Sequence, residues 1–290
     1  MKKAAVDTQK INVIYIAGCG HSGSTLFDLV LGAHSKIESL GEFYKIFDPV
    51  KRAAIKDCTC GSELHQCDFW KDVFFNDEHS CVNQLSEPEK TYNVLTKILD
   101  KTGKSFVCDS SKSIPNIEVY ESRPDLFQLY VIHLVRDPRA YVKSIENKKQ
   151  RVGVGESVTA EDKNPKMYNY SRAIWRWVLT NFRLIVKGIF GIKSSVVRYE
   201  DLCSDPARTL TAVLSRFDLS FEEEQLGFST LTHHNISGNR MRNNKNQMIK
   251  FEGSYLKKGS ISKLKWGFAT FFTSPLLILF KYPFSRKAPF

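Results

Sequence analysis

The sequence predicts an α/β protein in which a mostly parallel β-sheet carries helices on both faces. Short apolar segments rich in β-branched residues alternate with longer segments of helical periodicity. The short segments are continuously apolar, as buried parallel strands are, and a glycine-rich turn joins the first of them to the first helix. The chain has 290 residues, so we expect residues 1–290 to form a single domain.

The elements follow one another in a regular order. Strands are expected at residues 11–17, 37–40, 105–108, 129–135 and 195–197, and helices at residues 26–33, 87–99 and 169–190. The apolar stripe of the last helix contains Ile174, Val178, Phe182, Ile185 and Ile189. Residues 56–70 and 151–165 look irregular, and either segment is a candidate substrate-facing loop.

The charge of the chain favours an anionic partner. The net charge is +11, whereas the hydrophobic fraction of 42% and the charged fraction of 25% are ordinary for a globular protein. The seven cysteines are odd in number and scattered, which fits a reduced, cytoplasmic compartment. Polar residues 7–10 interrupt the apolar N-terminal pattern, so we expect neither a signal peptide nor an N-terminal anchor.

The turn after the first strand has the composition of a phosphate-binding loop. It reads GCGHSGST over residues 18–25, where glycines let backbone N–H groups converge on an anion and the next helix adds its positive end. The spacing matches a Walker A loop, except that Ser24 stands in the lysine position. The missing lysine argues against an ATPase or a kinase, in which it acts beside Mg²⁺ on the phosphates. A plain strand–helix turn is the alternative.

A second candidate phosphate contact follows the strand at 129–135. Arg136 stands at the strand end, where ligands bind in open α/β sheets, and Ser144 follows about two helical turns later. Both side chains are expected near the first loop, Arg136 as a two-pronged donor and Ser144 as a hydroxyl donor. An arginine that caps a helix and a solvent-exposed serine are the alternative.

The two motifs together resemble the nucleotide-binding motifs of the sulfotransferase superfamily. They read GCGHSGSTL and LVRDPRAYVKS, and AHSKIESLGEF, CDSSKS and VVRYEDLCSDP extend the resemblance over most of residues 11–242. The chain is similar to bacterial sulfotransferase-family proteins, and its first loop also resembles that of tyrosylprotein sulfotransferases. The resemblance implies a P-loop-NTPase-like fold and 3′-phosphoadenosine-5′-phosphosulfate as the sulfuryl donor.

The resemblance also implies roles for single residues. The 5′-phosphosulfate end would be held by Gly20, Ser22, Gly23, Ser24 and Thr25. Arg136 and Ser144 would hold the 3′-phosphate. His21 departs from the family pattern, which has lysine or arginine here to stabilise the bridging oxygen. A histidine can take this role when protonated or through one N–H group.

In-line transfer also needs a base for the acceptor hydroxyl and positive charge near the leaving phosphate. Glu42 follows the strand at 37–40 and is the candidate base, with a dipole-stabilised helix residue as the alternative. Lys112 resembles the family lysine that stabilises the transition state, but it is equally well interpreted as a surface lysine. Asp109 is expected to orient Lys112, to accept the proton or to cap a helix. No metal is expected in catalysis.

Two further polar segments carry candidates. The cysteines near position 60 are expected to be reduced or paired, and a structural zinc site is the alternative. The residues that would bind the zinc are Cys58, Cys60, His65 and Cys67. The Asp68-Phe69-Trp70 segment is expected to anchor this loop on the core. Later in the chain, Arg240 or Arg242 is a candidate phosphate contact, with an exposed basic loop as the alternative.

The C-terminal segment, residues 240–290, combines basic residues with an apolar run at 266–280 that Pro275 interrupts. The run is short for a membrane span. It is expected either to lie on an anionic membrane surface or to pack as a helix on the sheet. No nucleic-acid motif is present, so we expect no nucleic-acid partner.

The expected activity is sulfuryl transfer to a hydroxyl of an acceptor, which is a small molecule, a carbohydrate, a phenol or a lipid-linked compound. The protein is expected to be cytoplasmic. If its C-terminal segment lies on an anionic membrane surface, the protein is also membrane-associated. A small-molecule kinase with a P-loop is one alternative. A non-catalytic protein that binds a nucleotide or docks on a membrane is the other.

Overall fold

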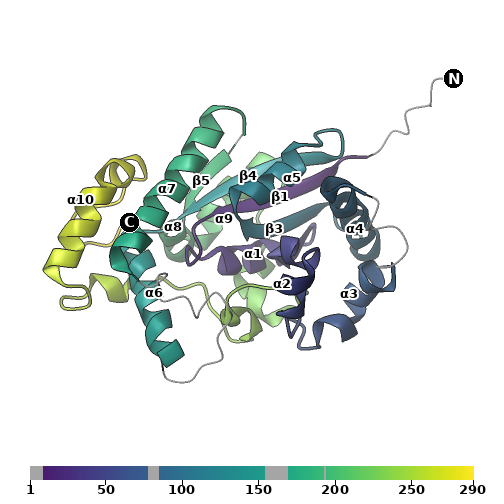
Figure 1. The fold of residues 1–290 in the computed structure, drawn as a ribbon, viewed down its shortest axis with the longest axis horizontal. Helices are drawn as coiled ribbons and strands as arrows, with labels where there is room; N and C mark the ends of the chain where they lie inside the picture. Colours follow the sequence, from purple (N-terminus) through teal and green to yellow (C-terminus); the bar gives the residue numbers. More distant parts are fainter. Residues whose placement is uncertain (1–8, 78–84, 154–168, 193) are drawn as a thin grey trace. The chain divides into compact units, whose positions relative to one another are not determined.

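A computed structural model describes residues 9–77, 85–153, 169–192 and 194–290 of the chain (Figure 1). Its strands are β1 (Ile11–Gly18), β2 (Ile37–Gly41), β3 (Phe106–Lys112), β4 (Phe127–Val135) and β5 (Ser194–Arg198), and they form one sheet in the order β2-β3-β1-β4-β5. β2 and β3 pair in parallel, with Ile37 opposite Phe106. The predicted α/β class with a parallel sheet is therefore confirmed, as is each predicted strand.

Helices connect and follow these strands. The α-helices are α1 (Ser24–Gly32), α2 (Pro49–Ala53), α3 (Asp68–Val73), α4 (Glu87–Thr102), α5 (Ile114–Glu121), α6 (Pro138–Gly153), α7 (Tyr170–Ile189), α8 (Tyr199–Ser204), α9 (Pro206–Leu214) and α10 (Lys263–Leu279). Short 3₁₀ helices are η1 (Phe43–Ile46), η2 (Leu64–Gln66), η3 (Phe75–Asp77), η6 (Ser215–Phe217), η7 (Glu223–Thr230), η8 (Arg240–Asn243) and η9 (Gly253–Leu256). The predicted helices at 26–33, 87–99 and 169–190 are α1, α4 and α7.

The strand order identifies the edge of the sheet where a ligand binds. From β1 the chain proceeds to β2 on one side, whereas from β4 it proceeds to β5 on the other. The carboxyl ends of two neighbouring strands with diverging connections form a topological switch point, which is the usual ligand site of open α/β sheets. The loop at residues 18–24 and Arg136 are the first residues after these two strands.

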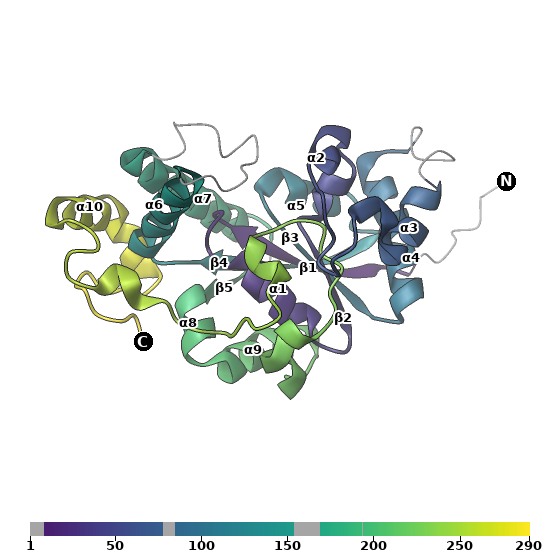
Figure 2. The ribbon, with the colours of Figure 1, turned by 90° about the horizontal axis from the view of Figure 1, so that it is seen from below.

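The chain forms two compact units. The first comprises Met1–Ile16, Thr25–Ile132 and Phe221–Met248, and the second comprises Ala17–Ser24, His133–Ser220 and Ile249–Phe290. In the first unit α4 packs on β3, α3 and α5. In the second unit α7 packs on α6 and α10, and α8 packs on β5 and α9 (Figure 2). The prediction of a single domain stays a prediction.

The buried face of α7 differs from the predicted stripe. Ile174 is buried as expected, but Phe182 is 55% exposed and Ile189 is 70% exposed. The helix instead buries Trp177 and Asn181, whose polar groups have partners. The Trp177 indole donates to the Arg136 carbonyl at 2.9 Å, and the Asn181 side-chain oxygen lies 2.8 Å from a His133 ring nitrogen. The prediction was wrong for Phe182 and Ile189 because it considered only apolar periodicity, whereas residues with hydrogen-bonded polar groups are also buried.

The C-terminal helix α10 packs in the core of the second unit, on α6 and α7. Its buried residues are Trp266, Ala269, Thr273, Leu276 and Leu277, and Pro275 lies within the helix. Its opposite face is also apolar, with Leu264 88%, Phe271 74% and Ile278 68% exposed. Among the helices described, none combines the length and the apolarity needed to cross a bilayer.

The two segments predicted to be irregular differ from each other. Residues 56–67 form an irregular segment that contains η2 and an isolated bridge between Asp57 and Glu63. Helix α3 begins at Asp68, and its buried side chains of Phe69 and Trp70 anchor the segment as expected. Of residues 151–165, the first three belong to α6 and 154–165 lie outside the described residues. Residues 1–8, which bear on the expected absence of a signal peptide, also lie outside them.

Candidate active site

The loop after β1 has a backbone shaped for close packing in the second unit. Gly23 has a φ of +92°, and a Cβ atom at this position would lie 2.2 Å from the Tyr199 ring. His21 has a φ of +67°, which is uncommon for a residue other than glycine. The Ser22 amide donates to the Cys19 carbonyl at 3.2 Å, and α1 begins at Ser24. Helix α1 thus follows the loop directly and presents its positive end there.

Arg136 lies beside this loop, as the sequence predicted. Its guanidinium donates to the carbonyl oxygen of His21 at 3.0 Å and lies 4.4 Å from the centre of the Tyr199 ring. Ser144 on α6 also reaches the loop, with its Oγ 3.3 Å from Nδ1 of His21. The structure therefore brings His21, Arg136 and Ser144 together, although they are far apart in the sequence.

Two buried polar atoms in this region bear on what it binds. Among the described residues, Ser22 Oγ and Arg136 Nε are buried and have no hydrogen-bond partner. Buried polar groups are normally hydrogen-bonded, because leaving one unpaired costs about 1–3 kcal/mol. A hydroxyl and a guanidinium N–H both donate to an anion. These two atoms therefore fit the phosphate and phosphosulfate groups that the sequence predicts for this loop.

The rest of the RDPR motif holds the turn after β4 in place. The buried Arg139 guanidinium donates to both carboxylate oxygens of Asp137, at 2.8 and 2.6 Å. The Asp137 amide donates to Glu200 at 3.0 Å, and the Tyr282 hydroxyl donates to the same carboxyl group at 2.7 Å. Burial raises the pKa of Glu200 to about 7, and the neighbouring Asp137 charge adds to this effect. Arg139 is thus a structural partner, whereas Arg136 is directed to the loop.

A second cluster of charged residues lies in the first unit, at the ends of β2 and β3. Glu42 follows β2 and forms ion pairs with Lys112, the last residue of β3, and with Lys45, at 2.5 Å. The Ser237 hydroxyl donates at 3.3 Å to the same Glu42 oxygen, Oε2, that Lys45 contacts, and Lys45 donates to Ser237 at 3.0 Å. The two predicted catalytic residues Glu42 and Lys112 are therefore direct partners.

The environment of Glu42 favours its ionised form. Burial alone would raise the pKa of this carboxyl group, but the charges of Lys112 and Lys45 outweigh burial and lower the pKa to about 2. A carboxylate with so low a pKa is a weak base. Lys112 has a φ of +71°, a backbone conformation that residues other than glycine rarely adopt.

The segment that contains Ser237 also contacts the end of the phosphate loop. The Asn239 amide donates to the Thr25 hydroxyl at 3.0 Å, within the first unit. Thr25 follows Ser24 directly in the chain, so this segment connects the Glu42 cluster with the last residue of the predicted loop. Thr25 Oγ1 accepts a protein hydrogen bond here, and its hydroxyl proton can still be donated.

Asp109 is buried and bound to its own strand and to α5. It accepts from the Ser111 amide at 2.8 Å and from the Tyr120 hydroxyl at 2.7 Å. Burial raises its pKa to about 6. Because its residue lies within β3 rather than before a helix, Asp109 supports the strand end and does not cap a helix.

Arg242 is likewise structural in this conformation. Its guanidinium donates to the carbonyl oxygens of Asn235 and Asp57, at 2.8 and 2.9 Å. These bonds attach the segment after η7 to the loop at 56–70.

Sequence reasoning missed three residues of the Glu42 cluster and its support. Lys45 and Ser237 contact Glu42 directly, and Asp28 contacts Gly41, the residue before Glu42. The Asp28 carboxylate accepts from the Gly41 amide at 3.2 Å and from the Asn235 side chain at 2.5 Å, and burial raises its pKa to about 8. The only available signal was a lone aspartate within the apolar segment of α1.

The sheet order is that of an open α/β protein, and a glycine-rich loop follows β1 at the carboxyl end of that strand. Solved structures confirm the fold. The sulfotransferase domain from the curacin biosynthetic pathway has a TM-score of 0.55 and 18% identity, covering 93% of this chain and 98% of that chain. The sulfotransferase domain of the Synechococcus PCC 7002 olefin synthase has a TM-score of 0.55 and 17% identity, covering 93% and 95%. A sulfotransferase from Mycobacterium avium has a TM-score of 0.51 and 12% identity, covering 96% and 79%.

The sequence itself identifies the family. Residues 13–223 match the family described as "Sulfotransferase family", and the chain belongs to it. No curated protein sequence matches the chain. The resemblance that the two nucleotide motifs indicated is therefore confirmed.

Proposed function

We propose that this sulfotransferase takes its sulfuryl group from 3′-phosphoadenosine-5′-phosphosulfate and transfers it to an acceptor hydroxyl. The observation that carries the donor is the pair of buried, unpartnered donors, Ser22 Oγ and Arg136 Nε, beside a loop that lacks the Walker lysine. The backbone of Gly20 and Gly23 and the hydroxyls of Ser22, Ser24 and Thr25 bind the 5′-phosphosulfate end. Arg136 and Ser144 bind the 3′-phosphate, which ATP lacks.

The donor supplies an activated sulfuryl group whose leaving group is a nucleoside bisphosphate. Glu42 accepts the proton of the acceptor hydroxyl as that oxygen bonds to sulfur. His21 and Lys112 stabilise the negative charge that grows on the departing phosphate oxygen.

The low pKa of Glu42 suggests how the base is activated. In this structure, ion pairs with Lys112 and Lys45 keep the Glu42 carboxylate ionised. The donor is strongly anionic, so its binding competes for these ammonium groups. When the lysines turn towards the donor, Glu42 loses the charges that lower its pKa and becomes a stronger base. Donor binding thus precedes efficient proton transfer.

Donor recognition is tested by comparing two nucleotides. We expect 3′,5′-bisphosphoadenosine to bind over tenfold more tightly than AMP, because a charge-assisted contact to the extra phosphate contributes about 1.5–3 kcal/mol. Arg136→Met should reduce this preference, whereas Arg216→Met, on the exposed surface, should keep it. Equal calorimetric affinities of the wild type for the two nucleotides would contradict the donor assignment.

Turnover and the acceptor are tested with a labelled donor. Incubation of the protein and a cell extract with the ³⁵S-labelled donor should label a hydroxyl compound, which is then identified. Transfer of phosphate from labelled ATP would instead favour the kinase alternative. Binding without any transfer would favour a non-catalytic protein.

We also propose that the exposed face of α10 contacts an anionic membrane surface. Leu264, Phe271 and Ile278 lie on one face of the helix, and Phe272 contacts Trp175 of α7 with 5.9 Å between ring centres. Exposed lysines stand at both ends of the helix, at Lys263 and Lys281. An apolar face flanked by cations suits the interface of a bilayer with anionic lipids.

A further inference from the structure

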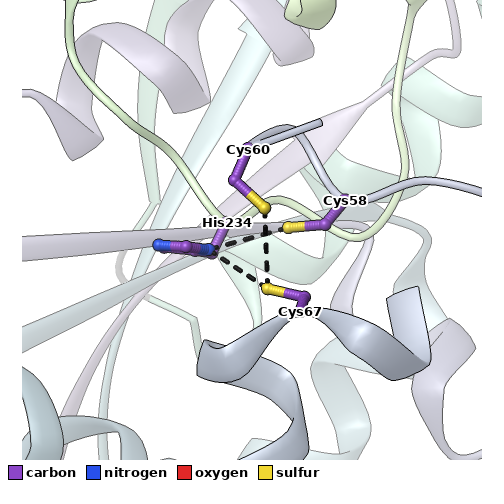
Figure 3. A group of neighbouring side chains, drawn as sticks. All are labelled: Cys58, Cys60, Cys67 and His234. Carbon is purple, nitrogen blue, oxygen red and sulfur yellow. Dashed lines mark hydrogen bonds between the residues drawn. The ribbon is translucent and has the colours of Figure 1, made fainter. Parts of the chain in front are cut away.

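Four side chains that bind soft metal ions gather in the first unit, and none of them belongs to the Glu42 cluster. Cys58, Cys60 and Cys67 come from the loop before α3, and His234 comes from the segment after η7 (Figure 3). Their ligand atoms all lie within 4.8 Å of one another. His65, the histidine that the sequence suggested, is not among them. Its side chain is 65% exposed and pairs with Glu63 instead.

The spacing of these atoms suits one tetrahedral ion. Nδ1 of His234 lies 3.7 Å from the Cys58 sulfur and 3.4 Å from the Cys67 sulfur, and the sulfurs of Cys60 and Cys67 are 3.6 Å apart. Zinc bonds of about 2.3 Å to sulfur and about 2.0–2.1 Å to nitrogen place tetrahedral ligands about 3.8 Å apart for two sulfurs and about 3.6 Å apart for sulfur and nitrogen. The three cysteines are free thiols in this structure.

Backbone amides are directed at the sulfurs of the three cysteines. The sulfurs accept hydrogen bonds from backbone amides, Cys58 from that of Cys60, Cys60 from that of Ser62, and Cys67 from that of Trp70. Gly61, with a φ of +98°, closes the tight turn that directs two of these amides inward. Amide donors around metal-bound sulfur reduce the repulsion between neighbouring thiolates.

The histidine is held by its surroundings. The His234 ring stacks on Phe69, with 4.6 Å between ring centres and an angle of 7° between the planes. Its backbone carbonyl accepts a hydrogen bond from the Trp70 indole at 2.7 Å. Both partners belong to α3, which starts directly after Cys67. The ring is thus fixed with Nδ1 directed to the sulfurs (Figure 3).

We propose that Cys58, Cys60, Cys67 and His234 bind one Zn²⁺ ion as a structural site. Three thiolates and an imidazole match zinc better than the hard cations Mg²⁺ and Ca²⁺, which prefer oxygen ligands. Four protein ligands leave no position for a substrate, as in structural zinc sites. Binding releases the thiol protons of the three cysteines, so the ligand set carries three negative charges. The nearby Arg242 guanidinium partly balances the resulting net charge.

The site connects two segments that lie far apart in the sequence. Next to His234, Asn235 accepts hydrogen bonds at its carbonyl from Thr59 and Arg242 and donates through its side chain to Asp28. Two residues later, Ser237 contacts Glu42. The metal therefore holds the segment that supports the Glu42 carboxylate, without touching the reacting groups.

Metal content tests the proposal on the full-length protein. The chain is produced in zinc-supplemented medium, purified without chelator and analysed by mass spectrometry of its elements. We expect about one zinc per chain, which is the stoichiometry of a single four-ligand site. His234→Ala and Cys58→Ser should lose most of it. The matched controls His65→Ala and Cys203→Ser should keep it, since neither residue belongs to the cluster.

A second measurement does not depend on whether the variants fold. The wild-type protein, stripped of metal under reducing conditions and then given Co²⁺, should show the intense visible bands of tetrahedral cobalt and a near-ultraviolet thiolate charge-transfer band. Less than about a tenth of a zinc per chain together with no such spectrum would overturn the proposal. So would loss of metal in His65→Ala with retention in His234→Ala, or a Cys60–Cys67 disulfide found in protein purified anaerobically.

Discussion

Glu42 is ionised in this structure, because the charges of Lys112 and Lys45 lower its pKa. If it is the base, Glu42→Gln should lower turnover by roughly 10²–10⁴ because proton transfer is lost. Donor affinity should not fall, because the variant leaves Lys112 and Lys45 available to the donor. Glu38→Gln is the matched control, since Glu38 also lies on β2 and pairs with a lysine, Lys104, at 2.8 Å. Initial rates and nucleotide titrations of both variants measure this. Turnover of Glu42→Gln within a few-fold of wild type would place the base elsewhere.

The pH dependence of the same step distinguishes activation by the donor from a permanently weak base. A protonated carboxyl group accepts no proton, so activity falls as pH drops through the pKa of Glu42. At saturating donor, kcat/KM for the acceptor should fall near or above pH about 4.3, the ordinary glutamate value. If Lys112 and Lys45 kept their places, the fall would occur near the pKa of about 2 instead.

His21 occupies the position where the family has a fixed cation, and it contacts Ser144. We expect His21→Arg to keep much of the activity and His21→Ala to lose roughly 10²-fold or more, as for other single transition-state donors. Rates are measured without Mg²⁺, because this loop lacks the lysine that acts beside a metal. EDTA is added only during the assay. An alanine variant as fast as wild type, or wild-type activity that requires Mg²⁺, would contradict this role.

At this scale the sequence predicted several side chains but not their mutual contacts. Arg136 and Ser144 were placed correctly beside the loop because motif spacing and the strand end fix them locally. The pairing of Glu42 with Lys112 was not predicted, because it depends on β2 lying beside β3. Ser237 was missed because it reaches Glu42 from 195 residues away, and no local pattern carries such a contact.

Among the elements, the loop between β1 and α1 depends on Gly23 far more than on Gly20. Alanine at Gly23 would combine a φ of +92° with a Cβ atom inside the Tyr199 ring, whereas a Cβ atom at Gly20 meets nothing within 4 Å. We expect Gly23→Ala to lower the free energy of unfolding by more than about 1 kcal/mol and to weaken nucleotide binding, and Gly20→Ala to change stability by less than about 0.5 kcal/mol. Denaturant unfolding and calorimetry give both quantities. Equal losses of nucleotide affinity in the two variants would show that both glycines serve the approach of the nucleotide, and that packing on Tyr199 is not the reason for Gly23.

The errors at the level of elements share one cause. The stripe of α7 was misplaced because Trp177 and Asn181 gain partners only in the folded chain. The fourth cysteine-cluster residue was assigned to His65 because it is close in sequence, but His234 lies 167 residues from Cys67. Local spacing identified the cysteines correctly, and only tertiary structure could supply the histidine.

For the molecule as a whole, the exposed face of α10 predicts a preference among lipid surfaces. We expect the protein to sediment with anionic vesicles more than with zwitterionic ones, and less so as salt is raised, because salt screens the lysines. The double variant Leu264→Ser, Phe271→Ser should lose this binding. Val50→Ser should not, although Val50 is 81% exposed, because it lies on α2 in the other unit.

If the protein bound anionic and zwitterionic vesicles equally, and the double variant bound as well as wild type, α10 would be excluded as the docking surface. A change in the melting temperature of the double variant by several degrees would show that the two residues also support the fold. Both residues are largely exposed, so we expect little change.

The fold class was predictable from the sequence, but the arrangement of the sheet was not. Alternating strands and helices require a parallel sheet, and the glycine-rich loop marks its first strand. The order β2-β3-β1-β4-β5 follows from which apolar faces pair, and residues of one strand carry little information about that choice. The chain's two compact units were also not expected, since β1 and β4 each continue from one unit into the other.

The left-handed backbone at His21 and Lys112 has a consequence for how this sequence can evolve. A non-glycine residue in that conformation costs roughly 1–2 kcal/mol. Selection for a more durable protein would therefore favour glycine at both positions, which are also the two candidate charge-stabilising residues of the reaction. We therefore expect His21→Gly and Lys112→Gly to raise the free energy of unfolding and to remove side chains that the proposed reaction uses. Stabilised versions of this enzyme should be sought at other positions.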